Sequence, residues 1–176
     1  MMEQLVSDKA HSGKTERLKV LLERLQKSKE KVKVGFASDI GAAIRFIQEI
    51  DEVKELIQMK QPAAMLLARE FEKDVLHPLK YKYDSERDAL LACLAYVIME
   101  TKTDEAVPTL IHFLRRNWNE EERCFYSLPL VARTLWSLTG QLKIPDYLSP
   151  IERREFILKQ AEAWAKHRKA NSSSET

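Results

Sequence analysis

Apolar residues recur along this chain with the period of an α-helix. The spacing i, i+3, i+4, i+7 occurs in six segments that form three successive pairs. The pairs repeat at a spacing of about 40 residues, which is typical of stacked helix-pair arrays. This recurrence predicts an all-α fold of stacked antiparallel helix pairs, a short α-α superhelix. The paired segments are Leu18–Leu25 with Ile40–Ile47, Ala64–Phe71 with Leu91–Ile98, and Val107–Leu114 with Val131–Leu138.

Turn and capping residues divide the pattern into about seven helices. The chain contains 4 Gly and 6 Pro, too few for a fold that depends on tight β-turns. Pro129 falls inside the predicted sixth helix, over 120–138, and predicts a kink or break there. Ser149, Pro150 and Glu152 have the spacing of a capping box, which begins the last helix. We therefore expect a flexible N-terminus over 1–13, a single helical-repeat-like domain over 14–169 that a C-terminal helix closes, and a disordered tail over 170–176.

The charge of the whole chain is nearly balanced. There are 29 Lys and Arg residues against 27 Asp and Glu residues, which gives a formal net charge of +2. Residues 1–36 and 143–176 are net positive, whereas residues 37–142 are net negative. This balance does not imply a dedicated nucleic-acid binder, and it favours solvated helix faces; a basic docking surface is the alternative.

Cysteine usage and hydropathy indicate a cytoplasmic protein. Cys93 lies within the apolar run 90–99, and neither it nor Cys124 belongs to a Cys-x-x-Cys pair. We expect Cys93 to be a core residue and the protein to reside in a reducing compartment. Residues 1–13 are too polar for a signal peptide, and no apolar run approaches the roughly 20 residues that span a bilayer. The sequence therefore predicts no membrane contact.

Three short motifs resemble those of HEAT repeats. Glu105–Leu114 (EAVPTLIHFL) resembles the first helix of such a repeat, and Leu130–Gly140 (LVARTLWSLTG) resembles the end of the second. Asp84–Arg87 (DSER) is similar to the start of a second helix. The resemblance covers residues 63–140 and implies a short right-handed stack that acts as a scaffold or adaptor. It carries no catalytic residues.

The sequence offers no signature of a catalytic, cofactor-binding or metal-binding site. Ser12–Thr15 ends like a phosphate-binding loop, but the preceding glycine and strand of that motif are missing. The four histidines do not have metal-ligand spacing. The acidic pairs Glu70/Asp74 and Glu86/Asp88 are better explained as solvated helix faces than as metal or acid–base groups. We therefore expect a non-enzymatic protein without catalytic residues, cofactor or metal.

One group of arginine and aromatic residues is a candidate binding site. Arginines beside Trp and Tyr near a helix-pair turn have the composition of an interaction hot spot. They also resemble a phosphate-contacting patch with stacking residues. The competing interpretation is that the aromatic rings close the core while the arginines pair with the acidic residues of 120–122. The candidate residues are Arg115, Arg116, Trp118, Arg123, Tyr126 and Arg133.

These features favour a protein–protein interaction module or scaffold. We expect its partner to be a protein segment that docks on the face formed by the second helices of the pairs. The alternative is a helical-repeat protein that binds the DNA backbone through a basic surface, with an affinity that falls steeply as salt rises.

Overall fold

The chain folds into helices throughout the part that the structure describes. The computed structural model describes residues 2–59, 61–76, 85–117, 126–140 and 148–172. Within these ranges it contains eight α-helices, two short 3-10 helices and no strand, which confirms the all-α prediction. The elements are α1 (Met2–Lys27), η1 (Glu30–Phe36), α2 (Ile40–Glu49), α3 (Asp51–Gln58), α4 (Gln61–Leu76), α5 (Ser85–Thr101), η2 (Asp104–Ala106), α6 (Val107–Arg116), α7 (Ser127–Thr139) and α8 (Pro150–Ser172).

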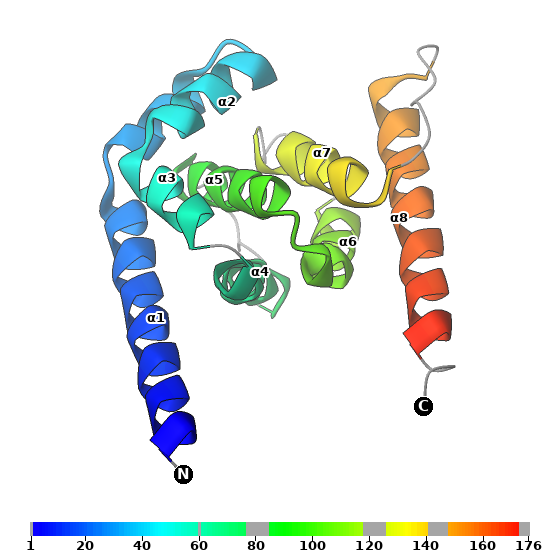
Figure 1. The fold of residues 1–176 in the computed structure, drawn as a ribbon. Helices are drawn as coiled ribbons and strands as arrows, with labels where there is room; N and C mark the ends of the chain where they lie inside the picture. Colours follow the sequence, from blue (N-terminus) through cyan, green and yellow to red (C-terminus); the bar gives the residue numbers. More distant parts are fainter. Residues whose placement is uncertain (1, 60, 77–84, 118–125, 141–147, 173–176) are drawn as a thin grey trace.

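The helices stack in two layers (Figure 1). α4 packs against α6, and α5 packs against α7, so the first helices of these two pairs form one layer and the second helices form the other. α3 extends the α5–α7 layer, and α1 lies against α3 and α5 at one end of the stack. At the other end α8 contacts both α6 and α7. The predicted closing C-terminal helix is therefore confirmed.

α5 is the central helix of the fold. Every side chain from Asp88 to Met99 is buried, because η1, α3, α4 and α7 all pack against this helix. A helix that is apolar on all sides belongs in the middle of a core. Cys93 is fully buried, as predicted, and burial raises the pKa of its thiol to about 12. In the other layer the rings of Phe71 and Phe113 meet edge to face, with centroids 5.1 Å apart, and join α4 to α6.

The helix boundaries differ from the predicted ones at both ends of the chain. α1 begins at Met2, within the segment that we expected to be flexible. Gly13 lies inside this helix, where glycine costs about 1 kcal/mol relative to alanine without ending it. α2 and α3 are separated at Ile50, which has extended backbone angles and a buried side chain. α8 continues to Ser172, three residues beyond the predicted end of the domain.

Prolines lie at the starts of the last two helices. α7 begins at Ser127, so Pro129 occupies its first turn, where the missing N–H would have no intrahelical partner in any case. The sequence predicted a kink or break at Pro129 within a helix over 120–138; α7 instead begins two residues before this proline, and residues 120–125 lie outside the described residues. The predicted capping box of α8 is confirmed, because the Ser149 N–H donates to Oε2 of Glu152 at 2.8 Å. The Glu152 N–H donates in return to Oγ of Ser149 at 3.3 Å.

Candidate interaction groove

The candidate arginines that the structure describes lie in two different places. Arg115 and Arg116 lie in the last turn of α6, and Arg115 forms an ion pair with Glu162 of α8 at 2.5 Å. Arg133 lies on α7 instead, beside the first turns of α8. Arg133 shares a groove with Arg154 of α8, whereas Arg115 pairs with Glu162, which is eight residues further along the same helix. Eight residues correspond to about 12 Å along a helix. The candidate residues that the structure describes therefore do not form one patch; Trp118 and Arg123 lie outside the described residues.

Tyr126 has a structural role in the fold. Its hydroxyl donates a hydrogen bond to the carbonyl oxygen of Ala37, which follows η1, and its own N–H donates to Oδ2 of Asp88 at 3.0 Å. The side chain is half-buried against the core. Tyr126 thus ties the start of α7 to two other parts of the chain, as the competing interpretation of the cluster expected.

Replacing Tyr126 by phenylalanine is expected to lower the free energy of unfolding by about 1 kcal/mol, because one partly buried hydrogen bond is lost while the ring remains. Urea denaturation of the two proteins measures this difference. Partner binding should not change. A Tyr126→Phe variant with native stability and weakened binding would place the hydroxyl in the binding site instead.

An open groove lies where α5, α7 and α8 meet. Its volume is about 770 Å³, within the range of ligand-binding clefts. Apolar side chains and basic side chains both line it, and Glu100 is the one acidic residue among the lining residues that the structure describes. We call it the α7–α8 groove; its lining residues are Ile40, Met99, Glu100, Lys102, Pro129, Ala132, Arg133, Trp136, Ser137, Arg153, Arg154 and Ile157.

Among the candidate residues that the structure describes, Arg133 is the one that lines the groove. Its side chain is exposed, and it forms no ion pair with any residue that the structure describes. It lies close enough to Tyr96 for its positive charge to lower the pKa of that phenol. Burial is the largest effect on this pKa and raises it. The charge of Glu100 also raises it, whereas the hydrogen bond from Gln48 lowers it. Within the described part of the chain, no carboxylate forms an ion pair with this cation at the edge of the groove.

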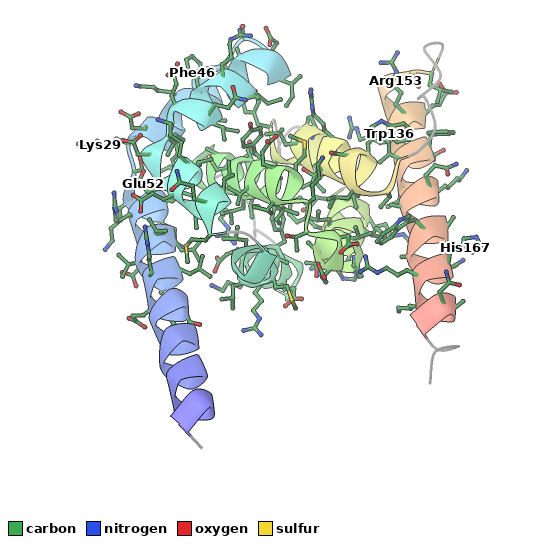
Figure 2. All side chains as sticks on the ribbon, viewed as in Figure 1. Lys29, Phe46, Glu52, Trp136, Arg153 and His167 are labelled. Carbon is green, nitrogen blue, oxygen red and sulfur yellow. The ribbon has the colours of Figure 1, made fainter. Side chains whose placement is uncertain are left out.

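The aromatic residue of the groove is Trp136. Its ring is partly exposed and lies 6.1 Å from the ring of Phe156, centroid to centroid. Figure 2 shows Trp136 where α7 meets α8, and Arg153 near the start of α8. Next to it, Nζ of Lys102 donates to Oγ of Ser137 at 2.7 Å, so the end of α5 is fastened to α7. An indole beside several cations is a suitable surface for an apolar anchor of a partner.

Asp88 positions the helix that carries Arg133. It is buried on α5, and its Oδ1 accepts hydrogen bonds from the N–H of Ser127 at 3.1 Å and from the Ser127 hydroxyl at 2.6 Å. Together with the bond from Tyr126, these contacts satisfy N–H groups at the start of α7. Burial raises the pKa of Asp88, and the three hydrogen bonds partly offset this. The expectation that Asp88 lies on a solvated face is therefore wrong.

Glu70 is also buried, contrary to the same expectation. Its Oε1 lies 2.5 Å from Nζ of Lys73 and its Oε2 lies 3.4 Å from Nη1 of Arg87. Nη2 of Arg87 donates to the Glu70 backbone oxygen at 2.8 Å. These contacts hold α4 against the start of α5. They identify Glu70 as part of the packing between helices and give no indication of acid–base chemistry.

The described residues offer no metal site. Among them no group of three His, Cys, Asp or Glu side chains is arranged to hold a metal ion. His112 is exposed on α6. None of the helices in the described ranges is both long and apolar enough to cross a membrane. Comparison with protein-family models, with curated proteins and with solved structures found no match to this chain.

Proposed function

We propose that this protein is a non-enzymatic protein–protein interaction module that binds a segment of its partner in the α7–α8 groove. The observation that carries the proposal is the groove itself, an open cleft beside the second-helix layer with an apolar floor and a basic rim. Protein interfaces combine such a desolvated apolar centre with a polar edge. This position is also where the sequence predicted docking, on the face formed by the second helices.

Contacts with the rest of the fold hold the walls of the groove in place. α8 is held by the buried side chains of Ile157 and Ala161, by the ion pair between Arg115 and Glu162, and by an ion pair between Arg168 and Asp104. α5 is buried along most of its length. A preformed site loses little conformational entropy on binding, which favours affinity.

The distribution of charge favours a protein partner over nucleic acid. α5 contributes Glu100 and no basic side chain to the groove. The basic residues gather on α7, on α8 and just after α5, whereas DNA-backbone binding requires cations that follow successive phosphates. The floor also includes Met99, Trp136 and Ile157, which offer no hydrogen bond to a phosphate apart from the indole N–H. A protein segment matches this mixture better.

Site-specific photo-crosslinking tests the location of the site. We expect p-benzoylphenylalanine at Pro129, which is exposed and lines the groove, to crosslink a protein from a lysate of the native cell. The same photo-reactive residue at Arg69, exposed on α4 away from the groove, is the matched control. The crosslinked product should be protease-sensitive, nuclease-resistant and absent when Arg133→Glu is added to the Pro129 variant.

Two results would contradict the proposal. Equal crosslinking from positions 129 and 69 would mean that the groove is not the docking surface. A crosslinked product that nuclease digests would mean that the partner is a nucleic acid, and a steep fall of its affinity with rising salt would support that reading.

A further inference from the structure

We propose that the segment bound in the α7–α8 groove is acidic and carries a large apolar anchor residue. This inference rests on the proposed function and names the chemistry of the partner. Among the lining residues that the structure describes, four are cations, Lys102, Arg133, Arg153 and Arg154, and one is a carboxylate, Glu100. Complementary charge across an interface determines which partners are accepted and which are rejected.

The cations of the groove come from three different parts of the chain. Lys102 follows α5, Arg133 lies on α7, and Arg153 and Arg154 lie in the first turns of α8. The rim therefore presents positive charge from more than one side to whatever occupies the groove. Arginine binds carboxylates through two parallel hydrogen bonds, so aspartate or glutamate side chains flanking the anchor fit this rim.

The floor of the groove provides the place for the anchor. Trp136 and Ile40 are half-buried and still partly accessible, and Met99, Ala132 and Ile157 lie deeper. Burying a leucine-sized or larger side chain on such a floor removes apolar surface from water and so favours binding. A purely polar acidic chain would leave these apolar side chains without a partner. The occupant therefore combines both chemistries.

Selection from a random peptide library displayed on phage, with the full chain as the target, tests the inference. We expect the enriched peptides to combine aspartate or glutamate with leucine, phenylalanine or tryptophan. Replacing the acidic residues of a synthetic enriched peptide by their amides should weaken binding at least about tenfold, as loss of charged hydrogen bonds predicts. Arg133→Gln should weaken it by a similar factor, and Arg69→Gln, on exposed α4, should leave it unchanged.

Other outcomes separate this inference from the proposed function. Enriched peptides that are neutral or basic, yet depend on Arg133, would overturn the acidic partner and leave the groove as the binding site. Acidic peptides that are indifferent to Arg133→Gln would overturn the groove itself. A selection without any enriched sequence, or peptides displaced by duplex DNA with a steep salt dependence, would overturn both.

Discussion

Replacing Asp88 by alanine is expected to lower the free energy of unfolding by about 3 kcal/mol. The carboxylate accepts three hydrogen bonds at the start of α7, two from backbone N–H groups and one from the Ser127 hydroxyl. Losing a helix cap costs about 1 kcal/mol, and leaving buried donors without acceptors adds about 1–3 kcal/mol. For a chain of this size the melting temperature should fall by roughly 6–12 °C.

Urea denaturation of three variants checks this prediction. Asp88→Asn should be less harmful than Asp88→Ala, because the amide oxygen still accepts from Ser127 while the amide nitrogen meets the N–H of Tyr126. Asp51→Ala is the matched control, since Asp51 is exposed and bonds only to Lys54 three residues away. We expect it to change stability far less. An Asp88→Ala variant as stable as the Asp51→Ala variant would contradict the structural role of Asp88.

The same residue is expected to make stability depend on pH. Because burial raises the pKa of Asp88 in the folded state, the native protein binds this proton more tightly than the unfolded chain does. The contribution is fully present below the unfolded pKa of about 3.9 and is lost as pH rises through the folded pKa. The stability of the wild type relative to Asp88→Asn should therefore decrease as pH rises across that interval. If the stability of the wild type relative to Asp88→Asn increased with pH instead, the hydrogen bonds to the carboxylate would outweigh burial in determining the pKa of Asp88.

Reversing the charge of Arg133 is expected to weaken partner binding about a hundredfold. An arginine–carboxylate hydrogen bond contributes about 1.5–3 kcal/mol, and a glutamate at the same place adds repulsion, which together correspond to about this factor. Stability should change by no more than about 0.5 kcal/mol, because Arg133 is exposed and has no ion pair among the described residues. Fluorescence anisotropy with the enriched peptide measures the affinity.

Charge reversal on α4 is the control for this prediction. Arg69→Glu changes the net charge of the protein by the same amount but lies on an exposed face that does not line the groove. Its effect on affinity should be small and should disappear at high salt. Equal weakening by both variants would show that the partner responds to net charge and not to Arg133.

The sequence predicted the helices because periodic apolar positions report which residues face a core. The stripe Leu91, Leu94, Ala95 and Ile98 located α5 correctly. It did not show that α5 is covered on every side, since the remaining faces are filled by other helices that are distant in the chain. The burial of Asp88 escaped prediction for the same reason. Its partners at 126 and 127 are almost 40 residues away in sequence.

The groove could not be predicted from periodicity. Its lining residues come from α2, the end of α5, α7 and the start of α8, and a cleft exists only where these surfaces fail to fill the space between them. Arg153 and Arg154 are adjacent in sequence, which on a helix does not place them on one face. Arg133 entered the candidate list through its arginine and aromatic neighbours. Of the four candidate residues that the structure describes, it is the one that lines the groove.

If Arg133 in the α7–α8 groove contacts an acidic residue of the partner, the two side chains are energetically coupled, and a double-mutant cycle measures that coupling. The affinities of wild type and Arg133→Glu are measured for the enriched peptide and for its variant with one acidic residue replaced by lysine. We predict that the lysine peptide binds Arg133→Glu at least about tenfold more tightly than it binds the wild type, a coupling that only neighbouring groups show. Additive effects of the two substitutions, with no recovery of affinity, would contradict the account.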